Sequence, residues 1–116
     1  DAPLASEAAI EAFVQKGNAG FWKFHDALFE RQREPDALKR PGLEKLAQEQ
    51  GLDMAKFKAA LDSRQHKARV DADMKAGNDA GISGTPAIVI NQYFVSGAQP
   101  FPSFKKLIEL ALKEAK

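Results

Sequence analysis

The run Gly81-Ile-Ser-Gly-Thr-Pro-Ala-Ile-Val-Ile90 constrains the fold of this chain more than any other segment. A loop ending in Gly84-Thr85-Pro86 leads into Ala87–Ile90, four apolar residues of which three are β-branched. Such a composition is typical of a strand that is buried on both faces of a sheet. Asn91-Gln92 suits a tight turn, and a second short strand, Tyr93–Val95, follows it. The segment therefore predicts a β-hairpin entered through a proline-containing loop.

The remainder of the chain is predicted to be helical. Glycines, prolines and capping residues divide it into helices at about 3–16, 19–33 and 64–80, with a last helix that starts between Pro100 and Ser103. Two shorter helices lie between them, one ended by Gly51 in a left-handed conformation and one capped by Asp53. Gly77 lies inside the predicted 64–80 helix, where it is expected to permit close packing against another element.

Composition limits the classes of function. The 116 residues form one domain at most, and the hydrophobic fraction of 44% is ordinary for a globular chain. A formal net charge of +1 argues against a nucleic-acid binder that works by neutralising phosphates. The chain has no cysteine, which excludes disulfides, thiolate catalysis and zinc sites built on sulfur. Its two histidines lie far apart, so we expect no metal site and no cofactor.

Four segments, in order, resemble the DsbA-like branch of the thioredoxin superfamily. They are Phe21-Trp-Lys-Phe-His-Asp-Ala-Leu-Phe29, similar to an aromatic "FW-x-x-HD-x-LF" helix; Gly51-Leu52-Asp53 with Phe57 and Leu61; Gly81–Pro86; and Val95–Pro100 before the closing helix. Gly-Thr-Pro alone is common, but four segments in the right order and spacing are a specific signal. The resemblance covers nearly all of the chain from the first helix onward.

The resemblance implies an incomplete thioredoxin-like fold of the α+β or α/β class, mostly helical, with a C-terminal β-hairpin and a closing helix. We expect a single domain over 1–116, with a helical region at 1–80 that corresponds to the family's helical insertion and a loop–hairpin–helix region at 81–116. The first β-α-β unit and its Cys-x-x-Cys motif have no counterpart in this sequence. The chain as given is therefore expected to lack redox activity, and we assign it no catalytic residue.

The candidate substrate-binding residues are Thr85 and Pro86. In related proteins this proline follows a cis peptide bond, and the residue before it offers backbone groups to a bound peptide. We interpret Gly84, Trp22 and His25 as structural, because no nucleophile lies near the histidine and aromatic residues at this helical spacing usually pack in a core. His66 lies among charged and polar residues, so we expect it to be exposed.

The resemblance also implies partners and a location. The complete protein would exchange disulfides with peptide or protein substrates in the periplasm or outside the cell, although a cytoplasmic location stays open. The strand at 87–90 is expected to recruit another strand, from a second copy or from an N-terminal fragment, because its edge would otherwise be unpaired. We expect no nucleic-acid partner and no membrane insertion. Two alternatives stay open: a cysteine-free binding module, and a helical scaffold that converged on these turns.

Overall fold

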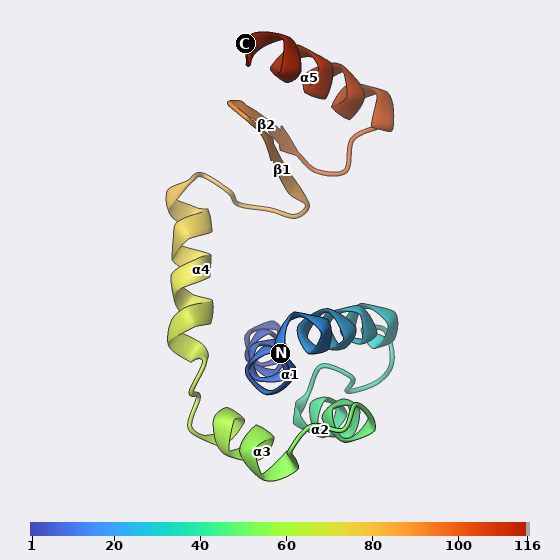
Figure 1. Ribbon diagram of the computed structural model, residues 1–116, viewed down its shortest axis with the longest axis vertical. Helices are drawn as coiled ribbons and strands as arrows, with labels where there is room; N and C mark the ends of the chain where they lie inside the picture. Colours follow the sequence, from blue (N-terminus) through green and yellow to red (C-terminus); the bar gives the residue numbers. More distant parts are fainter. Residues whose placement is uncertain (116) are drawn as a thin grey trace. The chain divides into compact units, whose positions relative to one another are not determined.

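The computed structural model describes residues 1–115 as helices joined to a single hairpin (Figure 1). The elements are α1 (Ala2–Arg31), α2 (Arg40–Glu49), α3 (Met54–Asp62), α4 (Lys67–Asp79), β1 (Ala87–Ile90), β2 (Tyr93–Ser96) and α5 (Phe101–Glu114). The chain divides into two compact units, Asp1–Met74 and a second one that begins at Lys75. The predicted class, mostly helical with a C-terminal hairpin and a closing helix, is confirmed. No helix within residues 1–115 combines the length and apolar character needed to cross a bilayer.

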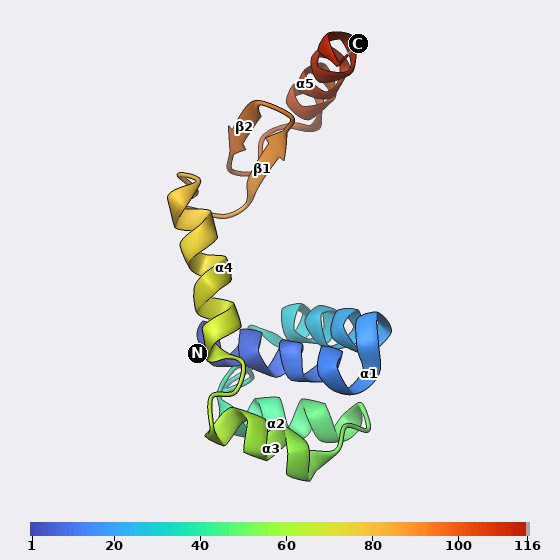
Figure 2. The same cartoon turned by 60° about the vertical axis from the view of Figure 1, so that its left-hand side comes forward.

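The bend in α1 gives the first unit its shape. Gly17 has φ 69° and ψ −159°, so the helix breaks there and its second half folds back beside the first (Figure 2). Glycine adopts this left-handed region without the steric cost that a Cβ atom would impose. The sequence predicted this stop after Lys16, and the two halves of α1 correspond to the two helices expected there.

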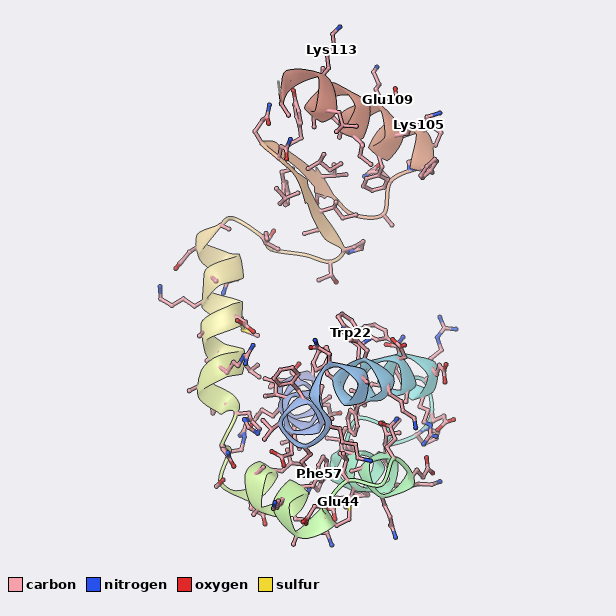
Figure 3. All side chains as sticks on the ribbon, in the orientation of Figure 1. Trp22, Glu44, Phe57, Lys105, Glu109 and Lys113 are labelled. Atoms are coloured by element: carbon pink, nitrogen blue, oxygen red, sulfur yellow. The ribbon has the colours of Figure 1, made fainter. Side chains whose placement is uncertain are left out.

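The core of the first unit lies where α1, α2 and α3 contact one another. Small residues on the first half of α1 allow a close approach, and Phe24 on the second half packs against Phe57 of α3, with ring centroids 6.3 Å apart. Both phenylalanines are fully buried. Figure 3 shows Phe57 between the helices of this unit. Apolar burial of this kind is the main force that holds short helices together.

Local signals fix the boundaries of α2 and α3. Gly51 follows α2 with φ 72°, as expected for a left-handed helix end. The side chain of Asp53 accepts a 3.0 Å hydrogen bond from the backbone N–H of Lys56 and thereby caps α3. Helix α2 begins at Arg40, and Pro41 fits its first turn because the missing N–H of proline is not needed there.

Two expectations about α4 are wrong. The helix begins at Lys67 rather than at Arg64, because Arg64 has φ 53° and cannot belong to a right-handed helix. A Cβ atom built on Gly77 meets no atom of the described chain within 4 Å, so the expected close packing at this glycine is absent. In the described chain, a larger residue at position 77 would meet no steric conflict at its Cβ atom.

The second unit consists of the hairpin and α5. Strands β1 and β2 are antiparallel, with Ile88 opposite Val95 and Val89 opposite Phe94. The turn lies at Asn91-Gln92, as predicted, and Asn91 has φ 52°. Helix α5 contacts β1, and Phe104, Leu107 and Ala111 lie on its more buried side, whereas Ile108 is 44% exposed. Lys105, Glu109 and Lys113 project away from the helix into solvent (Figure 3).

Candidate functional site

The Thr85-Pro86 segment lies at the entrance to the hairpin. Both residues are exposed, and the peptide bond between them is cis. The carbonyl oxygen of Pro86 accepts a 2.9 Å hydrogen bond from the N–H of Gly97, which closes the open end of the hairpin. Within residues 1–115, the backbone N–H and C=O of Thr85 make no such bond. An extended peptide could therefore pair with Thr85 without displacing a protein group.

Strand β1 has an open edge. It pairs with β2 on one side, and no other strand is present within residues 1–115. One face of the hairpin carries Ile88 and Val95, and Val95 is only 8% exposed. The opposite face carries Val89 and Phe94, which are 61% and 51% exposed. The strand is thus apolar at every position, but one edge and one face are uncovered.

Tyr93 ties the hairpin to α5. Its hydroxyl donates to the carboxylate of Glu114 at 2.7 Å, and the side-chain amide of Gln92 donates to the same carboxylate at 2.6 Å. The hydrogen bond to Glu114, with smaller contributions from burial and from the carboxylate charge, raises the pKa of Tyr93 above its ordinary value. This contact fixes the end of α5 against the strands that follow the Thr85-Pro86 loop.

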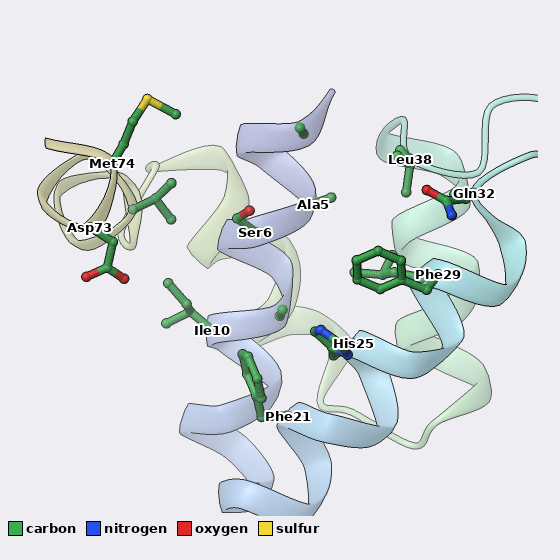
Figure 4. A pocket seen from close by; sticks show the side chains of 14 residues that line it. Ala5, Ser6, Ile10, Phe21, His25, Phe29, Gln32, Leu38, Asp73 and Met74 are labelled. Atoms are coloured by element: carbon green, nitrogen blue, oxygen red, sulfur yellow. The ribbon is translucent and has the colours of Figure 1, made fainter. Parts of the chain in front are cut away.

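A second concave region lies within the first unit, between the two halves of α1 and the beginning of α4 (Figure 4). This groove has a volume of about 660 Å³ and is mainly apolar. Phe21, His25 and Phe29 line one wall, and Val70 and Met74 of α4 line another. Asp73 contributes a charged side chain to the lining of the groove. The volume is large enough for a small molecule or for a side chain of a bound peptide.

His25 belongs to an aromatic cluster beside this groove. Its Nδ1 atom lies 3.0 Å from Oδ1 of Asp26, and its ring centroid lies 5.0 Å from that of Trp22 and 4.9 Å from that of Phe29. Core packing was expected for all the aromatic residues here. It holds for Phe24 but is wrong for Trp22 and Phe29, which are 54% and 61% exposed. The second half of α1 is covered on one side only, so the stripe that contains His25 faces solvent.

The sequence reasoning missed a set of buried polar side chains in the first unit. Glu7, Glu11 and His66 are 1%, 3% and 8% exposed, so the expected exposure of His66 is wrong. The Nε2 atom of His66 lies 2.9 Å from Oε1 of Glu11, and Arg64 contacts both carboxylate oxygens of Glu7. A signal was present: Glu7 and Glu11 interrupt an alanine-rich helix face at a spacing of four residues.

The described residues that the sequence singled out lie on exposed loop, strand and helix surfaces. The chain contains no cysteine, and residues 1–115 include no group of three or more His, Asp or Glu side chains placed to hold a metal ion. The predicted residues are also divided between the two units: Gly84, Thr85 and Pro86 belong to the second, and Trp22 and His25 to the first.

Comparison with known proteins gives two kinds of match. A family model described as DSBA-like thioredoxin domain matches residues 4–109. The Na(+)/H(+) antiporter NhaA 3 of Salinispora tropica is 34% identical over 90 residues, which are 78% of this chain and 13% of that protein. The Na(+)/H(+) antiporter NhaA of Herminiimonas arsenicoxydans is 34% identical over 113 residues, 97% of this chain and 16% of that protein.

A second group of relatives is named for disulfide bond formation. The probable disulfide bond formation protein D of Bacillus cereus is 28% identical over 114 residues, which are 92% of this chain and 50% of that protein. This chain therefore spans about half the length of that relative and a much smaller share of the antiporters. No solved structure matches the chain significantly.

Proposed function

This chain belongs to the family of DSBA-like thioredoxin domains, and we propose that it is the C-terminal part of a thiol:disulfide oxidoreductase. The complete protein exchanges disulfides with protein substrates: a thiolate attacks a disulfide sulfur, a mixed disulfide forms, and the second thiol of the pair releases the substrate. This chain has no cysteine and is inactive in that reaction by itself. Its contribution is the Thr85-Pro86 loop and the helical unit.

The observation that carries the proposal is the open edge of β1. An apolar strand with one free edge and an uncovered Val89–Phe94 face exposes surface that water solvates poorly. A further strand at that edge and a helix on that face would bury both. The relative named disulfide bond formation protein D, of which this chain matches 50%, supports such additional elements. A second copy of the chain is the other possible source of a strand.

Within that protein, Thr85 and Pro86 contact the substrate. The free backbone N–H and C=O of Thr85 pair with an extended substrate segment, and Pro86 positions them at the start of β1. This pairing holds the substrate disulfide near the cysteines that the rest of the protein supplies. We place the protein in the periplasm or outside the cell on the strength of the family resemblance.

The first test is the sequence of the coding region immediately upstream of Asp1. We expect a Cys-x-x-Cys motif after an apolar strand, several tens of residues upstream. The protein with that segment should reduce insulin disulfides in the presence of a thiol, whereas the chain as given should not exceed the background rate. An initiation codon that abuts Asp1, or a full-length protein with a cysteine pair but no activity, contradicts the proposal.

A second test addresses the substrate contact. In the complete protein, Thr85→Pro removes the backbone N–H, whereas Thr85→Ala keeps it and removes only the side chain. We expect kcat/KM for a disulfide-containing peptide to fall about tenfold in Thr85→Pro, the effect of losing one hydrogen bond. The rate with a small disulfide such as oxidised glutathione should change little. Equal losses in both variants refute a backbone contact.

A binding module without redox chemistry is the second candidate function. The two antiporter matches favour it, because in each the matched region is a small share of a protein named for ion antiport. A domain of this kind could serve there as an interaction module. An upstream segment without a cysteine pair, together with an open β1 edge that captures a partner strand, supports this candidate.

The oligomeric state tests the open edge directly. If β1 recruits a second copy, sedimentation should show dimers that dissociate on dilution, and Val89→Lys should weaken them because it places a charge on the uncovered face. Amides of β1 that are strongly protected from hydrogen exchange in a monomer at high concentration contradict strand recruitment in every form.

A further inference from the structure

The beginning of α4 lacks an apolar anchor to the first unit. None of the helix's residues is buried, and among Lys67–Met74 only Val70 is even partly covered. Isolated helices of this length are marginal in water, so packing normally holds them in place. The position of this segment must therefore depend on the residues that precede it, Ser63–His66.

Two of these preceding residues reach back to α1. The Nε atom of Arg64 donates to the two carboxylate oxygens of Glu7 at 3.0 and 3.1 Å, and its terminal NH2 group donates at 2.6 Å. Such a forked guanidinium–carboxylate contact fixes orientation as well as distance. Arg64 reaches it with φ 53°, a conformation that is uncommon for a residue with a side chain.

The second contact lies one helical turn along α1. His66 Nε2 lies 2.9 Å from Oε1 of Glu11, and the side-chain amide of Gln15 donates to Oε2 of the same carboxylate at 2.6 Å. Gln15 also accepts a 2.7 Å hydrogen bond from the backbone N–H of Asp53 at the start of α3. Each buried carboxylate thus has partners, and the contacts link α1, α3 and the approach to α4.

We propose that the Arg64–Glu7 and His66–Glu11 contacts form a two-point polar latch that holds the beginning of α4 against α1. The latch sets the position of Val70, Asp73 and Met74, the α4 wall of the groove in the first unit (Figure 4). Release of the latch lets this wall move and opens the groove. The proposal concerns the first unit alone and does not rest on the disulfide-exchange function.

The physical reason is the cost of leaving a buried carboxylate without a hydrogen-bond partner. Glu7 and Glu11 lose the partners Arg64 and His66 if the beginning of α4 moves away from α1, so this cost favours the arrangement described above. The carboxylates of Glu7 and Glu11 belong to residues that are 1% and 3% exposed, whereas no residue of α4 is buried. An element held in this way can detach while the core around Phe24 and Phe57 stays intact.

Spin labels can measure the latch directly, because a chain without cysteine accepts them at chosen positions only. Glu30→Cys on α1 and Ala72→Cys on α4 place labels at exposed positions of the first unit. In this background, Arg64→Gln and the double variant Glu7→Gln/Glu11→Gln weaken the latch. Asp79→Asn is the matched control, because it removes a charge from an exposed ion pair, Lys75–Asp79, that lies further along α4.

We expect a narrow label-to-label distance distribution in the parent and in Asp79→Asn, and a broad one in both latch variants. Hydrogen exchange at 67–74 should accelerate about 10- to 100-fold in the latch variants, with little change at the core amides of α2 and α3. Unchanged distances in a folded latch variant overturn the proposal. If Glu7→Gln/Glu11→Gln unfolds the whole unit, the result for Arg64→Gln decides between the possibilities. In that variant, hydrogen exchange that accelerates equally at the core amides and at 67–74 also overturns the proposal.

Discussion

Replacing Phe57 by alanine tests whether the Phe24–Phe57 contact is the centre of the first unit. Phe57 is fully buried, comes from α3, and packs against Phe24 of α1 with ring centroids 6.3 Å apart. Truncation of a buried phenylalanine costs about 3–5 kcal/mol, because apolar area is lost and a cavity remains. At about 0.05–0.15 kcal/mol per residue, a unit of this size has a free energy of unfolding of about 4–11 kcal/mol. Phe57→Ala therefore removes a large share of it.

Urea unfolding followed by tryptophan fluorescence measures this loss. Trp22 is the single tryptophan of the chain and lies on α1, so its emission reports the first unit. With a urea dependence of about 1 kcal/mol per molar, the midpoint should fall by about 3 M or the variant should be unfolded without urea. Phe57→Leu keeps most of the volume and should cost less than about 1.5 kcal/mol.

Phe29→Ala is the matched control. The side chain of Phe29 is 61% exposed, so its truncation on the same helix as Phe24 should cost less than about 1 kcal/mol. If Phe57→Ala and Phe29→Ala lower the free energy of unfolding equally, the core does not depend on the contact between α1 and α3, and the reasoning is refuted.

Three further predictions follow from local geometry. Tyr93, the single tyrosine, should ionise above its ordinary pKa of about 10 in an ultraviolet titration, and Glu114→Ala should remove most of the difference. Because the pKa of Tyr93 is higher in the folded state, the stabilisation by its hydrogen bond to Glu114 is complete below about pH 10 and is lost as the pH rises through the folded-state pKa. A free energy of unfolding that increases over this pH range contradicts the contact. Asp53→Ala removes the cap of α3 and should cost about 1 kcal/mol in urea unfolding, whereas Asp53→Asn should cost much less. Gly42→Ala places a Cβ atom 2.4 Å from the carbonyl oxygen of Ala37, so it should lower the thermal midpoint, and an unchanged midpoint would show that this loop can move aside.

The sequence alone determined the local architecture. The bend at Gly17, the helix end at Gly51, the cap at Asp53 and the turn at Asn91-Gln92 all lie where residue types predicted them. Each depends on backbone preferences or on hydrogen bonds within a few residues, which a neighbourhood in sequence specifies. The order and spacing of the four motif segments were also sufficient to recognise the family in a chain without the redox cysteines.

Which side chains are covered depends on contacts between residues that lie far apart in the sequence. His66 sits among polar neighbours in sequence but is buried against Glu11, which is 55 residues away. Trp22 lies in an aromatic segment but is exposed, because α1 is packed on one side only. Burial depends on which helices meet and at what angle, and that arrangement is set by many distant contacts at once. A linear pattern shows that a face is apolar or charged, but the partner that covers it is chosen by the fold.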